Sequence, residues 1–353
     1  MRDVAKAAGT SVASVSATLH GTRGETIRVS QGTRERIRNI ADQLGYVANP
    51  IAKSLATGKT KVLGLMLPYA DAFLDQNPFC NGVMHGVMAM AVRRHYNLMM
   101  YTAVGGSLDD HAARLVDSRV DGLILVMPPA ESNLIRHCER VGLPFVSILL
   151  PATPGRACVN ADDELGGRLA ARHLVELGHR RIGILLGSED VSTTAPRQRG
   201  FVGELAQNGI QVPERFLEVG GFSPVGGYDG MNRMIECCRH SLPTAVFAAN
   251  DLAADGAMRA LREHGFDVPG DVAIVGYDDT WFATMTQPPL TSVRMPISEM
   301  GEAAAAILID QLEGEPVANT QPVLPVSLTV RQSSGASCSD SSPWTATSPV
   351  LIQ

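Results

Sequence analysis

Hydrophobic residues in the first 45 positions recur at spacings of three and four, which is typical of amphipathic helices. The pattern predicts three short helices, over residues 2–8, 12–19 and 31–44. Ser11 and Ser30 are good N-cap residues, and Gly45 stands where a helix often ends in a left-handed residue. Two short helices joined by a glycine-containing turn, with a third closing the core, form a helix-turn-helix. Small helical bundles of other kinds show the same pattern.

The rest of the chain, from residue 62 on, alternates between apolar strand-like runs and amphipathic helical stretches. The predicted strands cover residues 62–67, 98–102, 122–126 and 145–150 in the first half and 181–186, 245–248 and 272–276 in the second. Apolar runs without polar alternation, separated by helices, indicate parallel sheets buried on both faces. The predicted fold class is a small all-α helix-turn-helix head followed by an α/β body with two doubly wound parallel-sheet lobes.

Charge is unevenly distributed along the chain. Residues 1–61 contain ten Lys and Arg and four Asp and Glu, a net charge of +6, whereas the whole chain of 353 residues carries −6. The remaining residues therefore carry −12. Because binding to a polyanion needs basic side chains concentrated on one surface, we expect contact with nucleic acid at the head and not at the body. The alternative is a solvated basic segment without a partner.

The sequence disfavours several classes of site and protein. The six cysteines form no CxxC pair and no regular framework, so neither a metal site nor a disulfide framework is expected. The chain lacks a Gly-rich phosphate loop, a nucleophile elbow and an HExxH motif, so we expect no cofactor and no enzyme activity. It has no signal-peptide pattern and no apolar run long enough to span a bilayer. We therefore expect a cytoplasmic protein without membrane contact.

The head contains DVAKAAGTS at 3–11, SVS at 14–16, VS at 29–30, TRERI at 33–37 and LGY at 44–46. With these strings it resembles the head of the LacI family of bacterial transcriptional regulators. It implies sequence-specific DNA binding, typically by a repressor, with the second helix in the major groove. The positions that would face DNA are Ser11, Val12, Ala13, Ser14, Ser16, Ala17 and His20. Alternatively, Ser11 and Ser14 contact only phosphates, and His20 is a solvated helix-end residue.

The resemblance continues through NPIAKSL at 49–55, which is similar to the family's hinge helix. It implies that Asn49, Ala52 and Leu55 contact the minor groove, with Leu55 as an apolar wedge that opens the central base step. The alternative is that Leu55 is an ordinary packing residue. Ala17 departs from the family pattern, because many relatives have an arginine there that reads guanine, so the operator sequence cannot be transferred from them.

Polar and aromatic side chains follow the predicted strands of the body, where doubly wound sheets bind ligands. Asn77 and Phe79 follow the strand at 62–67, Arg197 follows 181–186, Asn250 follows 245–248, and Asp278 follows 272–276. Carboxylate, amide, guanidinium and aromatic groups together suit a polyhydroxylated molecule, because they accept and donate hydrogen bonds to hydroxyl pairs and cover a sugar ring. The residues alone therefore indicate a ligand site at these strand ends.

The body also resembles the LacI-family effector domain, which is of the periplasmic-binding-protein type. The matching strings are LGHRRI at 177–182, GF at 200–201, PTA at 243–245, AND at 249–251 and GYDD at 276–279. The resemblance implies that Arg197, Asn250 and Asp278 bind the effector and that Phe222 stacks on its ring, with Asn77 and Phe79 lining the same cleft. Structural alternatives are an N-cap role for Asn250, a turn for Asp278 and lobe packing for Phe222. The acidic run 162–164 is read as a helix start and not as a metal site.

The expected domain organisation follows from the same resemblance. It comprises a DNA-binding domain over 1–45, a hinge helix and linker over 46–61, a bilobal domain over 62–331 and a disordered tail over 332–353. Lobe 1 would comprise 62–160 and 291–322, and lobe 2 would comprise 161–290 and 323–331. Helices near 79–94 and 108–116 would form the homodimer face.

The expected partners are double-stranded, pseudo-palindromic operator DNA, a small-molecule effector and a second copy of the chain. A sugar is the expected effector, although related regulators respond to purines or to partner proteins. The sequence does not decide between a dimer and a larger assembly. Whether the effector releases the operator or promotes binding is also left open. The rival interpretation is a solute-binding protein of the same bilobal fold, which the basic head argues against.

Overall fold

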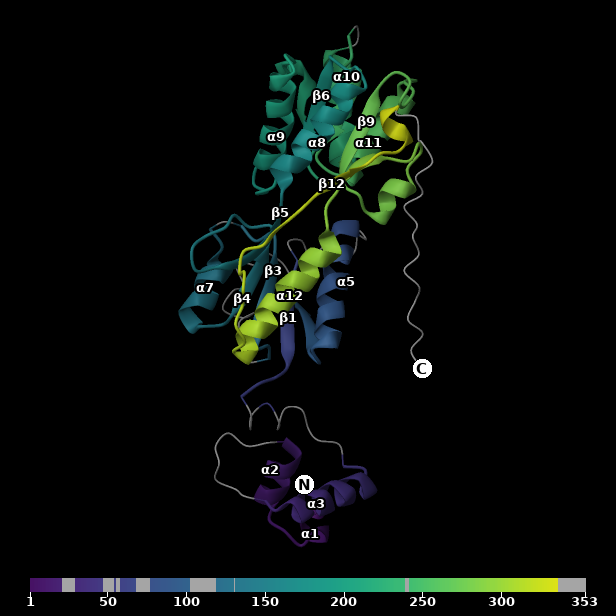
Figure 1. Ribbon diagram of the computed structural model, residues 1–353. Coiled ribbons are helices and arrows are strands. Elements are labelled where there is room, and N and C mark those ends of the chain that lie inside the picture. The colour runs from purple at the N-terminus through teal and green to yellow at the C-terminus, as the bar shows by residue number, and fades with distance from the viewer. Residues whose placement is uncertain are drawn as a thin grey trace.

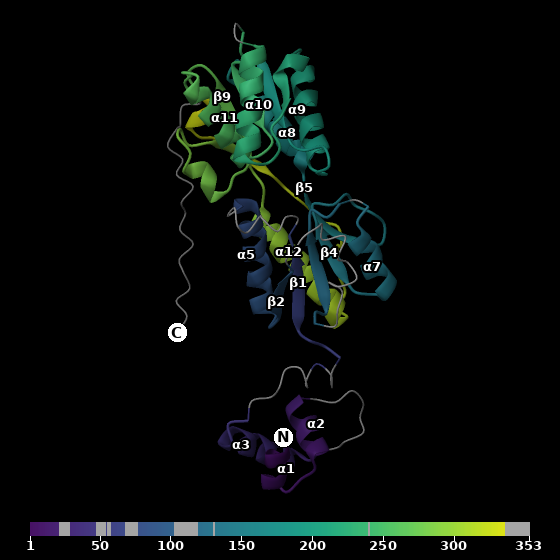
Figure 2. The same ribbon diagram turned by 180° about the vertical axis from the view of Figure 1, so that it is seen from behind.

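The computed structural model describes residues 1–20, 29–46, 54, 58–67, 77–101, 119–129, 131–238 and 241–335. It contains a small helical head and a body of two α/β lobes, as predicted, and Figures 1 and 2 show the body from opposite sides. None of the helices in these ranges is long and apolar enough to cross a membrane.

The head consists of three helices, α1 (Arg2–Ala7), α2 (Val12–His20) and α3 (Gln31–Gln43). The Ser11 hydroxyl accepts a hydrogen bond from the amide of Ser14 at 3.0 Å and so caps α2. Ser30 caps α3 in the same way, and Gly45 has a φ of +60° just beyond the helix end, as the sequence predicted. A small core holds the three helices together, comprising Val4, Ala5, Ala8, Val15, Ile37 and Ala41.

Lobe 1 is a six-stranded parallel sheet in the order β11-β5-β4-β3-β1-β2. Its strands are β1 (Val62–Met66), β2 (Asn97–Tyr101), β3 (Gly122–Val126), β4 (Phe145–Ile148), β5 (Ala157–Ala161) and β11 (Val323–Leu324). Helices α5 (Pro78–Arg93) and α12 (Ile297–Glu313) pack on the face that carries Leu63 and Ile124. Helix α7 (Asn133–Val141) packs on the opposite face, which carries Leu123 and Leu125.

Lobe 2 repeats this plan in the strand order β12-β10-β9-β8-β6-β7. Its strands are β6 (Ile182–Leu186), β7 (Leu217–Val219), β8 (Ala245–Ala248), β9 (Ala273–Asp278), β10 (Thr291–Arg294) and β12 (Ser327–Thr329), of which only β12 is antiparallel to its neighbour among these. Its helices are α8 (Asp163–Glu176), α9 (Thr194–Gln207), α10 (Pro224–Cys237) and α11 (Asp251–Glu263), with short turns η3 (Glu214–Phe216), η4 (Trp281–Thr284) and η5 (Gln332–Ser334). Helices α8 and α9 pack on one face of the sheet, and α10 and α11 pack on the other.

Two of the predicted lobe boundaries differ from those in the structure. The predicted return to lobe 1 at 291 is wrong, because β10 (Thr291–Arg294) pairs with β9 in lobe 2. The predicted crossing at 322 is also early, because β11 (Val323–Leu324) still pairs with β5 in lobe 1. Both strands are short, and three of the four residues of β10 are polar, so neither stands out as an apolar run. The chain therefore crosses between β5 and α8, between β10 and α12, and between β11 and β12 (Figure 1).

The predicted disordered tail begins too early. Residues Gln332–Ser334 form η5, and Ser333 and Ser334 are buried. The Ser333 hydroxyl donates to the carbonyl of Ile274 at 2.6 Å and accepts from the amide of Thr291 at 2.9 Å. These hydrogen bonds to two strands keep the serines in place, because they satisfy the buried hydroxyl fully. The body thus continues to residue 335, and the rest of the predicted tail lies outside the described residues.

Two glycines let α5 and α12 approach closely. A Cβ on Gly86 of α5 would overlap the carbonyl oxygen of Ser298, and one on Gly301 of α12 would overlap the carbonyl oxygen of Val83. In contrast, a Cβ on Gly203 of α9 would meet nothing within 4 Å. The same substitution should therefore have opposite effects at Gly86 and at Gly203.

Gly86→Ala should lower the free energy of unfolding by about 2 kcal/mol, because the added methyl forces two packed helices apart. Gly203→Ala should raise it by about 0.5–1 kcal/mol, because alanine loses less backbone entropy in a helix. Urea denaturation followed by circular dichroism measures both. A Gly86→Ala protein as stable as the wild type would contradict the close α5–α12 packing.

Candidate functional site

The carboxyl ends of β6, β8 and β9 meet at the edge of lobe 2 that faces lobe 1 (Figure 1). Arg197 lies in the helix that follows β6, Asn250 lies between β8 and α11, and Asp278 is the last residue of β9. The topology thus brings together three of the residues that the sequence singled out. All three side chains are buried. Parallel strands produce this convergence, because their carboxyl ends lie along one edge.

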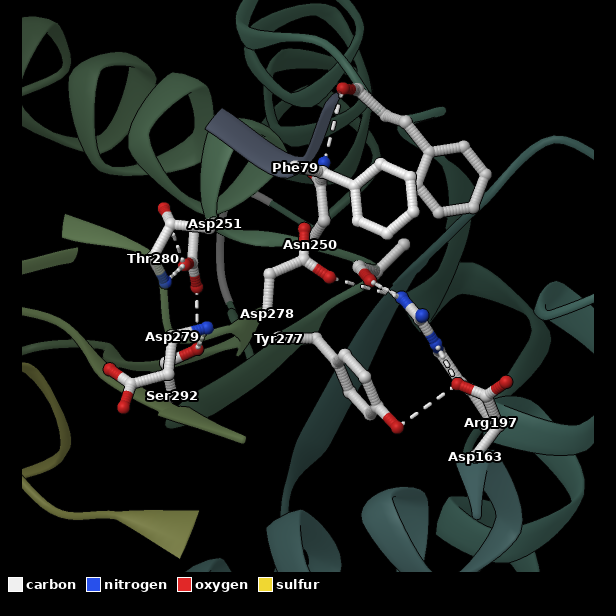
Figure 3. A network of polar contacts seen from close by, with 12 residues as sticks. Phe79, Asp163, Arg197, Asn250, Asp251, Tyr277, Asp278, Asp279, Thr280 and Ser292 are labelled. Atoms are coloured by element: carbon white, nitrogen blue, oxygen red, sulfur yellow. Dashed lines mark hydrogen bonds and ion pairs between the residues drawn. The ribbon is translucent and has the colours of Figure 1, made fainter. Parts of the chain in front are cut away.

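Arg197 occupies the centre of this cluster (Figure 3). Its Nε donates to Asp163 Oδ1 at 2.7 Å, and its Nη1 donates to the Ala249 carbonyl at 2.7 Å. The guanidinium also lies 3.6 Å from the centroid of the Tyr277 ring, a cation–π contact. Burial lowers the pKa of Arg197, but the charges of Asp163, Tyr277 and Asp278 and the hydrogen bond to Asp163 together raise it by more, so the guanidinium stays charged.

Asp278 lies at the end of β9 with its carboxylate toward Arg197, at 4.0 Å between Oδ1 and Nη1. Its backbone has a φ of +106°, a region that favours glycine, so the fold holds this side chain in place at a conformational cost. The residue is only 7% exposed, yet its carboxylate has no hydrogen-bond partner among the described residues. Burial raises the pKa of Asp278 to about 7, against the opposing effect of Arg197. A buried acceptor of this kind is left ready for a donor from outside the chain.

Asp251 belongs to the same cluster, and both of its carboxylate oxygens accept hydrogen bonds from the protein. Its carboxylate accepts from the Ser292 hydroxyl at 2.5 Å and from the Thr280 amide at 3.1 Å. Burial, followed by the charge of Asp278, raises the pKa of Asp251 well above its ordinary value. Asp251 therefore positions the turn after β9, and its raised pKa favours the uncharged form of its carboxyl.

Asn250 is a helix N-cap, which is the structural alternative that the sequence left open. Its Oδ1 accepts from the amide of Ala253 at 2.9 Å and so caps α11, while its Nδ2 donates to the carbonyl of Phe222 at 3.2 Å. The Phe222 ring lies over Gly187, where any Cβ would overlap it. Asn250 thus holds the Phe222 segment beside the carboxyl end of β6. Contact of either residue with an effector stays a prediction.

Lobe 1 contributes Asn77 and Phe79 at the start of α5. Asn77 Oδ1 accepts from the amides of Phe79 and Cys80 at 3.0 and 3.3 Å, so this side chain caps the helix. The Phe79 side chain is buried and lies beside Asn250 and Asp278 in Figure 3. Burial, and then the charge of Asp278, raises the pKa of the Cys80 thiol to about 12. The start of α5 therefore covers the lobe 2 cluster from the opposite side.

The predicted DNA-facing residues of the head lie on or next to α2. Ser11, Val12 and Ala13 are exposed, and Ser14, Ser16 and Ala17 are half-buried, so this face of the helix is not used by the head's own core. The Ser11 and Ser14 hydroxyls lie 2.9 Å apart. His20 ends the helix. Asn49, Ala52 and Leu55, like the predicted second dimer helix at 108–116, lie outside the described residues.

Sequence reasoning missed the supporting residues of the site. Asp163 was interpreted only as part of a helix start, although Asp162 is the actual N-cap of α8 and Asp163 pairs with Arg197. Tyr277 falls within the matching string at 276–279, but nothing in the sequence indicates that its ring contacts the guanidinium. The available signal was the run of three acids at 162–164, which is longer than a helix cap requires.

Known families match both the head and the body of the chain. Residues 1–49 match the family described as bacterial regulatory proteins of the lacI family, and residues 171–334 match a periplasmic binding protein-like domain. The chain is 33% identical over 334 residues to the HTH-type transcriptional regulator CelR of Thermobifida fusca, covering 94% of this chain and 96% of that protein. It is 30% identical over 315 residues to the HTH-type transcriptional repressor PurR of Haemophilus influenzae (strain PittEE), covering 88% and 90%.

Solved structures agree over almost the full length. A complex of the transcriptional regulator CelR with cellobiose has a TM-score of 0.73 at 31% identity, covering 94% of this chain and 98% of that one. The lac repressor dimer bound to operator and the anti-inducer ONPF has a TM-score of 0.80 at 27% identity, covering 95% and 98%. The chain therefore belongs to the LacI family and is a DNA-binding transcriptional regulator with a helix-turn-helix head and a periplasmic-binding-protein-like body.

Proposed function

We propose that the protein is a homodimeric repressor whose affinity for a pseudo-palindromic operator is controlled by a sugar bound between the two lobes. Its DNA target would place it in the cytoplasm, and the ligand site would serve sensing and not catalysis. The observation that carries the proposal is the buried Asp278 carboxylate, which lacks a hydrogen-bond partner among the described residues and lies beside a charged guanidinium. The cellobiose of the CelR structure supports a sugar as the ligand class.

The structure offers a physical route from the ligand site to the hinge. Helix α12 begins where the chain crosses from lobe 2 and ends at Glu313, whose carboxylate pairs with Lys61 Nζ at 2.7 Å. Asp121 accepts from the amides of Thr60 and Lys61 at 2.7 and 2.8 Å. The linker that follows the hinge is therefore fastened to lobe 1. A change in lobe closure would move α12 and the linker together, and so would change the spacing of two heads in a dimer.

A solute-binding protein of the same fold is the second candidate. The bilobal body alone would suit that function equally well. The head argues against it, because α2 presents exposed small and polar residues on a helix-turn-helix that matches the lacI family.

Selection of bound sequences from a random pool of duplexes, with the full-length protein at moderate salt, tests the proposal directly. A dimeric regulator should enrich an inverted repeat with half-sites about one helical turn apart. Enrichment of a single half-site would contradict the homodimer, and the absence of any motif would contradict sequence-specific binding.

Leu55→Ala should weaken binding to the selected operator at least about tenfold while leaving non-specific DNA binding within about twofold, because only a bent specific complex needs the wedge. Fluorescence anisotropy with operator and scrambled duplexes measures both affinities. Equal losses on the two duplexes would contradict the wedge role.

Asp278→Ala should leave operator affinity within about twofold and abolish the response to the effector, because the carboxylate lies in the body and far along the chain from the head. Asp271→Ala, which removes an exposed acid of the same lobe, is the control and should respond as the wild type does. Fluorescence anisotropy measures the operator affinity of each variant with and without the sugar that releases the wild type. A full response from Asp278→Ala would show that another residue holds the effector.

A further inference from the structure

The turn that follows β9 has a backbone conformation that residues with side chains rarely adopt. Asp278 and Asp279 have φ values of +106° and +50°, so two consecutive residues lie in the region that favours glycine. Such a conformation costs free energy and persists only where the surrounding structure holds it. The turn also sets the direction of the Asp278 carboxylate, whose Oδ1 lies 4.0 Å from Nη1 of Arg197. The contacts that hold Asp279 therefore help to shape the ligand side of lobe 2.

The backbone of the turn is held by two neighbouring elements of lobe 2. The amide of Asp279 donates to the hydroxyl of Ser292 in β10 at 3.1 Å, and the amide of Thr280 donates to Oδ2 of Asp251 in α11 at 3.1 Å (Figure 3). These two hydrogen bonds satisfy the amides of the turn. They leave the carboxylate of Asp279 to other partners.

The carboxylate of Asp279 is held by the C-terminal segment of the body. Thr329 Oγ1 donates to its Oδ2 at 2.7 Å, and Arg331 Nη2 lies 2.7 Å from its Oδ1. Thr329 and Arg331 are two positions apart in extended backbone, which places their side chains on the same face of the segment. The side chains of Asp279 and Arg331 are 7% and 19% exposed, so this ion pair is largely buried.

The C-terminal segment is also anchored by contacts that do not involve Asp279. Strand β12 pairs with β10. The amide of Arg331 donates to Thr291 Oγ1 at 2.8 Å, and its Nη1 donates to the carbonyl of Leu290 at 2.6 Å. Because these contacts are independent of the turn, the segment is a fixed support for the carboxylate.

Loss of this support would act directly on the turn. Without Arg331, the Asp279 carboxylate would be buried without a cation, close to the buried carboxyls of Asp251 and Asp278. The carboxylate can reach water only if the backbone around Asp279 rotates. Because the present conformation is itself costly, the turn would relax to one that residues with a Cβ prefer. Asp278 is the adjacent residue, so its carboxylate would turn away from Arg197.

We propose that Thr329 and Arg331 are positioning residues of the effector site, which hold the Asp279 carboxylate and thereby keep Asp278 directed toward the ligand. Both act through Asp279 and need no contact with the effector. The inference rests on the proposed function, since it concerns the same ligand site. It adds two residues from the segment immediately before the predicted disordered tail, which the sequence did not connect with ligand binding.

The first test needs no ligand and measures hydrogen exchange by mass spectrometry on the full-length protein. In Thr329→Val and in Arg331→Gln, the amides of Asp279 and Thr280 should exchange at least about tenfold faster than in the wild type, because the turn opens more often. Peptides from β1 and β8 should keep their wild-type rates. Thr329→Val leaves the ion pair in place, so it keeps the test decisive if Arg331→Gln does not fold.

Three further variants separate positioning from general stability. Thr320→Val, at an exposed threonine of lobe 1, and Arg233→Gln, which removes a surface ion pair with Glu218, should leave the turn at its wild-type rate. Arg331→Lys keeps a charge beside Asp279 and should stay within about threefold of the wild type. Wild-type exchange at the turn in Thr329→Val and Arg331→Gln would overturn the inference, as would equal acceleration in all strands of lobe 2.

The second test measures ligand binding by calorimetry, with cellobiose, glucose and ribose as probes. The sugar that binds the wild type should bind Thr329→Val and Arg331→Gln at least about tenfold more weakly. Operator affinity without sugar should stay within about twofold of the wild type, because the head is not altered. An unchanged dissociation constant for the sugar in both variants would overturn the inference.

The two tests fail in different ways. If none of the three sugars binds the wild type but the turn exchanges faster in the variants, the proposed sugar ligand is contradicted and the positioning of the turn stands. If a sugar releases the wild type from its operator and both variants respond equally well, the proposed function stands and the positioning role fails.

Discussion

The buried ion pair between Arg197 and Asp163 is the interaction on which the ligand side of lobe 2 depends. It joins α9 to α8, and through the Ala249 carbonyl and the Tyr277 ring it also joins the ends of β8 and β9. Removing one partner would leave the other charge buried without compensation, which is far more costly than a lost surface contact. Because Asp163 pairs with Arg197, the carboxylate of Asp278 is left without a hydrogen-bond donor among the described residues.

The rest of the body connects this cluster to the linker before β1. Three chain crossings join the lobes, and the Ser192 hydroxyl donates to the Leu149 carbonyl across the junction at 2.8 Å. One of the crossings continues directly into α12, whose far end is fastened to the linker by Glu313 and Lys61. Gly86 and Gly301 allow α12 and α5 to pack closely against each other. The cluster around Arg197 and the linker at residues 58–61 are thus connected by packed secondary structure.

The sequence predicted the parts of the fold that depend on local pattern. The three head helices, with their Ser11 and Ser30 caps, and the apolar central strands follow from periodicity and capping chemistry. It could not predict β10 or η5, because Thr291 and Ser333 are polar residues that become buried only through hydrogen bonds to each other's segments. Those bonds join positions that lie far apart along the chain, so no local pattern reports them.

The candidate site was likewise predictable only in part. Strand-end logic and family resemblance located Arg197, Asn250 and Asp278 in one cluster. Neither could show that Asn250 is a helix cap or that Asp163 already neutralises Arg197, since these are long-range contacts. The distinction matters for function, because it decides which side chains are left to meet a ligand.

The central claim is that the site between the lobes and the operator-binding head are energetically coupled. The most direct test is a closed thermodynamic cycle, in which operator affinity is measured with and without effector, and effector affinity with and without operator. The account predicts that the two ratios are equal and differ from one by at least about fivefold, as linkage requires of coupled sites. Ratios of one would contradict it, because the ligand would then bind without any influence on DNA.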